Sequence, residues 1–136
     1  MSDPSESSTG AWVAPIGAIT LFVDDLAATV RFYTDVFELP VVYADDDSTV
    51  FRFGATLVNL LRRGAAAELV EPATVGDPSA GAVAVFTLPV DDVDVRCARL
   101  VERGVTLLNG PIDRPWGPRT ASFRDPAGHV WEIAAG

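Results

Sequence analysis

The chain contains the same short pattern twice, and this internal repeat limits the folds that it can adopt. Segment 23–26 (VDDL) is matched by 90–93 (VDDV), each after a β-prone run and before apolar residues at helical spacing. Near the ends of the two halves, 58–60 (VNL) matches 131–133 (WEI). Neither half of a 136-residue chain is large enough to bury its own sheet face, so the halves must pack together.

Each half is expected to follow the order β-α-β-β-β. The acid pairs Asp24-Asp25 and Asp91-Asp92 offer N-caps to the two helices. The expected first-half elements are strands at 16–23, 41–44, 49–53 and 56–61, and a helix at 26–37. The expected second-half elements are strands at 82–90, 105–108, 120–123 and 130–133, a helix from 93 to Gly104, a loop at 109–111 and a tight turn at 125–128.

This pattern divides the chain into four parts. Residues 1–14 are predicted to be a mobile tail, 15–63 the first βαβββ module, 64–81 a connection and 82–136 the second module. The connection is rich in Gly, Ala and Pro, and a short strand is expected near 67–70. The predicted class is α+β, with two paired modules and the helices outside.

Charge and composition exclude several functional classes. The net charge of −9 argues against nucleic acid, whose phosphates need a basic face, and is compatible with a cationic small ligand. No apolar run approaches the ~20 residues of a membrane helix, and the polar first ten residues are not a secretory signal. Cys97 is the only cysteine, which excludes an internal disulfide, and a cytoplasmic location is expected.

The C-terminal hairpin carries the clearest family likeness. Segments 116–119 (WGPR), 123–128 (FRDPAG) and 131–133 (WEI), with the helix entry 23–33 (VDDLAATVRFY), resemble the vicinal oxygen chelate superfamily. That superfamily includes glyoxalase I, bleomycin-resistance proteins and extradiol dioxygenases, and the resemblance covers residues 16–136. It implies βαβββ modules whose mixed sheets curl around a cavity, and a homodimer. Whether the modules pair within one chain or swap between two chains stays open.

The resemblance also implies a set of metal-ligand positions, and this chain lacks most of them. They fall at Ala18, Asn59, Val85 and Glu132, of which only Glu132 matches a family ligand. The one histidine, His129, is three residues from Glu132, so the two face opposite sides of a regular strand. A catalytic metal needs about three protein ligands, so no cofactor is predicted; a divalent metal at Glu132 is the alternative.

Strand alternation gives the expected lining of the cavity. The predicted ligand-binding residues are Thr20, Phe22, Asn59, Val85, Thr87, Trp116, Arg119 and Glu132. Arg119 would bind a carboxylate or phenolate, or else lie on the surface. Trp116 would stack on a ligand or cap the core edge. Glu132 would move a proton, anchor a cation, or be held by a hydrogen bond or by Arg119. Trp12 is expected at a dimer interface.

Four functions are compatible with these residues, the fourth being a purely structural or regulatory interaction domain. The first is sequestration of a small cationic or aromatic molecule in a metal-free cavity, in the manner of bleomycin resistance. The second is a metal-independent lyase or isomerase in which Glu132 moves a proton and Arg119 stabilises the enolate. The third is a metal-dependent glyoxalase or dioxygenase. The sequence leaves open whether any reaction is catalysed.

Overall fold

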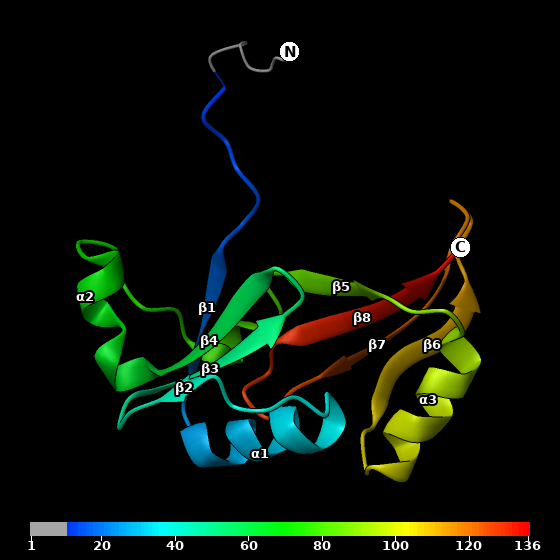
Figure 1. Cartoon of the computed structure of the whole chain (residues 1–136), viewed down its shortest axis with the longest axis horizontal. Coiled ribbons are helices and arrows are strands. Elements are labelled where there is room, and N and C mark those ends of the chain that lie inside the picture. The colour runs from blue at the N-terminus through cyan, green and yellow to red at the C-terminus, as the bar shows by residue number, and fades with distance from the viewer. Residues whose placement is uncertain (1–10) are drawn as a thin grey trace.

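The computed structural model describes residues 11–136, except for the side chain of Pro78, and contains the βαβββ order twice (Figure 1). The first module comprises β1 (Ala18–Val23), α1 (Leu26–Val36), β2 (Tyr43–Ala44), β3 (Ser48–Phe53) and β4 (Thr56–Arg62). The second comprises β5 (Val85–Pro89), α3 (Val93–Glu102), β6 (Leu107–Asp113), β7 (Arg119–Arg124) and β8 (Val130–Ala135). The α+β prediction is confirmed. Residues 1–10 of the predicted tail lie outside the described residues.

The repeated acid pairs start both helices as expected. The carboxylate of Asp25 accepts the backbone N–H of Ala28 at 3.0 Å, and that of Asp92 accepts the N–H of Val95 at 3.1 Å. In both pairs the second acid is the N-cap, which satisfies one of the amide donors left free in the first turn. None of the described helices is long and apolar enough to cross a membrane.

The strands form two separate mixed sheets of the same design. Their orders are β1-β4-β3-β2 and β5-β8-β7-β6. In each sheet the first strand is parallel to the last strand of its module, and the other neighbours are antiparallel. The chain between these two parallel strands contains the helix and the other two strands of the module, which together form the long crossover that parallel neighbours need.

The connection contains a helix in place of the predicted strand. Ala67–Val70 is α2, a single helical turn. Alanine, glutamate and leucine are good helix formers, and neither sheet extends to this segment, so a strand would have no partner. Figure 1 shows α2 at the edge of the molecule beside the first sheet.

The predicted loop at 109–111 is also wrong, because these residues lie inside β6. The pairing of β6 with β7 shifts register on both sides of Asn109, which marks an irregular, bulged strand. Gly110 permits the irregularity with φ of 88°. An added Cβ there would overlap the carbonyl oxygen of Thr120 and lie 2.6 Å from the Cα of Ala121. β7 therefore packs directly against the backbone at Gly110.

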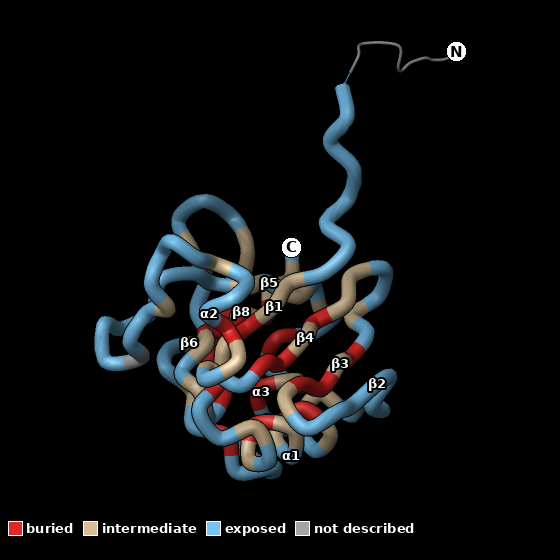
Figure 2. The backbone as a smooth tube through the Cα atoms, turned by 90° about the vertical axis from the view of Figure 1, so that its left-hand side faces the viewer, coloured by how far each residue is buried: buried red, intermediate tan, exposed pale blue. Residues whose placement is uncertain are grey.

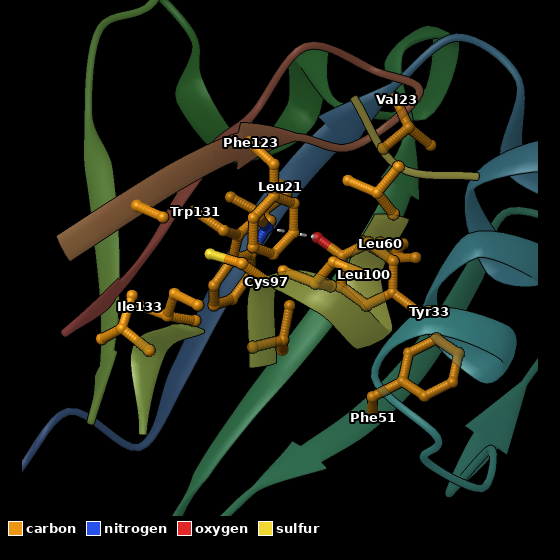
Figure 3. Close-up of a cluster of buried hydrophobic side chains, with 14 residues drawn as sticks. Leu21, Val23, Tyr33, Phe51, Leu60, Cys97, Leu100, Phe123, Trp131 and Ile133 are labelled. Atoms are coloured by element: carbon orange, nitrogen blue, oxygen red, sulfur yellow. Dashed lines mark hydrogen bonds between the residues drawn. The ribbon is translucent and has the colours of Figure 1, made fainter. Parts of the chain in front are cut away.

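The two modules share one hydrophobic core (Figure 3). It is built from the faces of both sheets that point toward the helices. The cluster contains Leu21, Val23, Tyr33, Phe51, Val58, Leu60, Val93, Cys97, Leu100, Val105, Ala121, Phe123, Trp131 and Ile133. Aromatic rings join the modules: Phe53 of β3 stacks on Trp131 of β8 with centroids 5.0 Å apart, and Phe32 of α1 lies 6.3 Å from Phe123 of β7. Helix α1 therefore packs against both sheets.

A buried polar network reinforces this junction. The hydroxyl of Tyr33 on α1 donates to Asp125 Oδ2 at 2.9 Å and accepts the indole N–H of Trp131 at 3.1 Å. Asp125 Oδ1 accepts the backbone N–H groups of Ala127 and His129, which closes the β7–β8 turn. Burial, together with the nearby Asp125 carboxylate, raises the pKa of Tyr33 far above its ordinary value. The hydroxyl therefore remains a donor at every physiological pH.

Candidate functional site

Each sheet has an outer face, which we define as the side turned away from the helices and the shared core. Residues paired across strands project to the same face, so the register assigns the lining. The first outer face carries Ala18, Thr20, Phe22, Val50, Leu57, Asn59 and Leu61. The second carries Val85, Thr87, Asn109, Thr120, Ser122 and Glu132. Six of the predicted ligand-binding residues are thus on outer faces.

The second outer face has a polar row that runs across all four strands. The register aligns Thr87, Glu132, Ser122 and Asn109, one from each strand. The hydroxyl of Thr87 donates to Glu132 Oε1 at 2.8 Å. Among the described residues Glu132 has no cationic partner within salt-bridge distance. Its carboxylate is held by a neutral hydroxyl and keeps its second oxygen for another partner.

The corresponding row of the first outer face is much less polar. Asn59 lies between Thr20 and Val50 in the register. Its Oδ1 atom is buried and has no hydrogen-bond partner among the described residues. A buried carbonyl oxygen without a partner is costly, because it has lost water and gained nothing in return. Asn59 is therefore a second position where a further partner is expected.

A single chain does not bring these two faces together. The inner faces of both sheets meet in the shared core through Tyr33, Phe53 and Trp131, so the outer faces point away from one another. Figure 2 shows the buried residues within the body of the molecule, whereas the segment before β1 extends from that body as exposed chain. Trp12 in that segment is 89% exposed, so its expected dimer contact remains a prediction.

Arg119 is not where the cavity prediction needs it. In β7 it alternates with Thr120 and shares the inner face with Ala121 and Phe123. Its guanidinium donates to both carboxylate oxygens of Asp94 on α3 at 2.9 Å and to Asp113 at 3.1 Å. These hydrogen bonds hold the pKa of Asp94 below its ordinary value. Arg119 and Glu132 therefore lie on opposite faces, which removes the structural basis for an enolate role of Arg119.

An arginine that sequence reasoning missed, Arg114, reaches onto the second outer face, where Arg124 at the end of β7 also projects. It lies in the loop between β6 and β7, and its side chain donates to Thr120 and Asn109, both on the outer face. Trp116, which is 72% exposed, lies in the same loop beside the Arg114 guanidinium. The sequence contained one indication of this pair, because Arg114 and Trp116 are two residues apart in a segment that Gly117 marks as a turn.

A cleft of about 360 Å³ lies where the modules meet. Thr20 and Phe22 of β1 line one side, and the end of the connection lines the other. The ring Nε2 of His129 is 2.9 Å from the carbonyl oxygen of Phe22. His129 thus links the β7–β8 turn to β1, while Cys97 is buried in the core.

The side chains at the family's ligand positions do not fit a catalytic metal. Ala18 and Val85 have no donor atom, and Asn59 and Glu132 supply one amide and one carboxylate. Thr20 pairs with Asn59 in the register, and Thr87 pairs with Glu132. Moving the expected ligand positions two residues along their strands, from Ala18 to Thr20 and from Val85 to Thr87, therefore supplies no histidine either. Among the described residues no group of three or more His, Cys, Asp and Glu side chains is arranged to hold a metal ion.

Comparisons with known proteins agree with this architecture. Residues 15–133 match the family model described as Glyoxalase/Bleomycin resistance protein/Dioxygenase superfamily. The uncharacterized protein YraH of Bacillus subtilis is 35% identical over 119 residues, which cover 85% of this chain and 93% of YraH. The virulence protein STM3117 of Salmonella typhimurium is 27% identical, over 88% of this chain and 82% of its own length.

Solved structures extend the likeness to three dimensions. A glyoxalase/bleomycin resistance protein/dioxygenase from Nocardioides superposes with a TM-score of 0.81 at 26% identity, covering 95% of this chain and 88% of that one. A lactoylglutathione lyase from Agrobacterium tumefaciens gives 0.74 at 24% identity, over 91% and 95% of the two chains, and at that identity it shows the fold alone.

Proposed function

Because the chain belongs to the glyoxalase/bleomycin resistance protein/dioxygenase superfamily, we propose that it binds a small cationic or aromatic molecule without a metal. The observation that carries this proposal is Glu132, an acid on the outer face of a sheet with a neutral hydroxyl as its partner. Around it the two outer faces supply mostly apolar and hydroxyl side chains, the usual composition of a small-molecule pocket. The function would be sequestration, as in bleomycin resistance.

The cavity would be shared between two copies of the chain. Within one chain the outer faces point apart, and both Val85 and Trp116 are more than half exposed. In a homodimer the first outer face of one chain would cover the second outer face of its partner. Glu132 of one chain would then face Asn59 of the other across the cavity, and the Asn59 amide oxygen, which has no hydrogen-bond partner among the described residues, would accept from a donor group of the guest. The site is incomplete without the second copy.

Ligand-dependent stability tests the binding proposal. Purified protein would be screened by thermal unfolding against cationic, neutral and anionic aromatic compounds, with and without EDTA, and its mass measured by light scattering. A ligand at about 100 times its Kd stabilises the folded state by ~2.7 kcal/mol, which raises Tm by several degrees. We expect a dimer and an EDTA-insensitive rise for at least one compound.

Two matched variants locate the effect. Glu132→Gln should lose most of the rise that a cationic compound produces, because the amide has no charge to pair with it. Glu102→Gln removes an exposed acid at the end of α3 and should keep the rise. A monomer that no compound stabilises, or equal behaviour of the two variants, contradicts the proposal.

A metal-independent lyase or isomerase is the second candidate, and the free oxygen of Glu132 favours it. Since Thr87 occupies only Oε1, the other oxygen is able to take a proton from a substrate. Glu132→Gln should then lower kcat by roughly 100-fold or more while leaving Kd nearly unchanged. Equal turnover in the variant and the wild type would exclude this candidate.

A further inference from the structure

The side chain of Arg114 is anchored on the second outer face by neutral groups. Its Nε donates to Thr120 Oγ1 at 2.8 Å, and its Nη2 donates to Asn109 Oδ1 at 2.8 Å. Thr120 is only 2% exposed, so one anchor is part of the packed sheet. Two hydrogen bonds to different strands, β7 and β6, hold the guanidinium plane in one orientation.

This environment differs from that of the paired arginines. Arg62, Arg63, Arg103 and Arg119 each bind at least one carboxylate. Within residues 11–136, Arg114 has no carboxylate within salt-bridge distance, and its Nη1 amino group has no hydrogen-bond partner. Arg31, Arg52, Arg96, Arg99 and Arg124 likewise have no carboxylate partner among the described residues, but of these six arginines Arg114 alone is fixed by side-chain hydrogen bonds. Arg114 therefore presents an oriented positive charge with unused donors.

An aromatic ring lies beside this cation. The guanidinium carbon of Arg114 is 5.7 Å from the centre of the Trp116 ring. Backbone hydrogen bonds from Gly117 to Arg114 at 3.0 Å, and from Arg114 to Pro118 at 2.8 Å, close the turn that carries both side chains. Trp116 is 72% exposed, so much of its surface is available to another molecule. The oriented N–H donors of Arg114 and the exposed ring of Trp116 therefore lie together at the edge of the second outer face.

We propose that Arg114 and Trp116 bind the carboxylate and the ring of an aromatic carboxylic acid on the second outer face. A guanidinium recognises a carboxylate through parallel N–H donors, and an indole stacks on a planar ring. This inference rests on the proposed function and, of its two guest classes, takes the aromatic one and specifies it as an aromatic acid. Asn109, which anchors Arg114, lies two strands from Glu132 in the polar row, or roughly 10 Å. The guest's carboxylate is thereby kept away from the protein's own.

A pair of isosteric probes tests this charge recognition. 4-Nitrobenzoate and 4-nitrobenzamide have the same ring and nearly the same shape, but only the first is an anion. Titrations of ¹⁵N-labelled protein would follow the Arg114 Nε–H and Trp116 indole N–H signals. We expect saturable shifts of both signals with the benzoate, and at least tenfold weaker binding of the benzamide.

Substitutions at Arg114 supply the decisive comparison. Arg114→Gln should weaken 4-nitrobenzoate binding at least tenfold and leave benzamide binding unchanged. Arg114→Lys, which keeps the charge but loses the fork, should weaken benzoate binding several-fold. Arg99→Gln, an exposed arginine on α3, should change neither. If Arg114→Gln fails to fold, Trp116→Ala replaces it and should weaken both probes.

The failure of this inference is distinguishable from failure of the proposed function. Equal affinities for the two probes, or benzoate binding that Arg114→Gln does not weaken, overturns the aromatic acid and leaves binding at Glu132 standing. The absence of any saturable benzoate shift also overturns it. Loss of all ligand-induced stabilisation in the wild type, by contrast, removes the proposed function itself.

Discussion

The two modules have the same backbone order but different chemistry at equivalent positions. Across the first sheet the register aligns Thr20, Asn59, Val50 and Tyr43. Across the second it aligns Thr87, Glu132, Ser122 and Asn109. The second row holds a carboxylate and three other polar groups, whereas the first holds an amide whose oxygen has no partner among the described residues. The repeat determines the fold, and the side chains on the outer faces determine what each half is able to bind.

The edges of the two sheets differ as well. Strand β2 has two residues, whereas β6 has seven and contains the irregular pairing around Asn109. That irregularity allows Asn109 to reach Arg114 on the outer face. The second sheet therefore has a longer edge strand, whose irregular pairing brings Asn109 beside Arg114, and the first variant below tests that pairing.

The largest effect is expected from Gly110→Ala. The added Cβ would collide with the backbone of β7 at Thr120 and Ala121, and φ of 88° is unfavourable for alanine. We expect a loss of several kcal/mol in the free energy of unfolding, about 3 or more, measured by urea denaturation. Gly54→Ala, at a positive φ in the first module but in open space, should lose only about 1 kcal/mol. Equal losses would contradict the close packing of β6 on β7.

The next effect concerns the junction of the modules. Tyr33→Phe would leave Asp125 Oδ2 buried without its donor and should cost about 1–3 kcal/mol in urea unfolding. Tyr43→Phe removes a hydroxyl that also donates to an aspartate, Asp45, but on the surface. It should change the stability by less than about 0.5 kcal/mol. A small effect at Tyr33 would mean that the polar network adds little to the shared core.

A third comparison uses the two rows directly. Asn59→Leu removes the buried oxygen that lacks a partner and should stabilise the protein by about 1 kcal/mol. Thr87→Val removes the donor that Glu132 accepts and should destabilise it by a similar amount, about 1 kcal/mol. Thermal unfolding of both variants checks the signs. Destabilisation by Asn59→Leu would show that the amide has a partner in the assembled protein.

The smallest effect is a pH dependence on the inner side of the second sheet. Hydrogen bonds from Arg119 hold the pKa of Asp94 below its ordinary 3.8. A lowered pKa in the folded state stabilises the protein fully above that ordinary value, and the contribution is lost as pH falls through the lower one. Asp94→Asn should be slightly less stable than wild type at neutral pH, and the gap should close in acid. Asp91→Asn, which changes an exposed acid before the same helix that Arg119 does not contact, is the matched control.

Much of the fold was predictable because local chemistry and global packing agree. The acid pairs cap both helices, and alternation assigns Thr20, Asn59, Thr87 and Glu132 to outer faces. Alternation along β7 also predicts the face on which Arg119 lies. Arg119 is one residue from Thr120, on the outer face, and two residues from Ala121, on the inner face.

Other features depend on tertiary contacts that alternation does not encode. Asn109-Gly110-Pro111 is typical of a loop, and only the fit of Gly110 against β7 keeps it in the sheet, so the role of Asn109 beside Arg114 was hidden. Likewise, both faces of the strands carry apolar residues, so the sequence does not reveal which faces meet within a chain. The choice is made by α1, whose aromatic rings contact both sheets.

Because α1 packs against both sheets, it also determines which sequence changes the chain tolerates. Because Tyr33 and its neighbours bond one half to the other, the covalent linker at 64–81 is not what keeps the halves in position. Its length and composition are free to drift, whereas a new bulky or small residue on the inward side of α1 disturbs both halves at once. Mutational tolerance should therefore be high in the linker and very low along that one helical stripe.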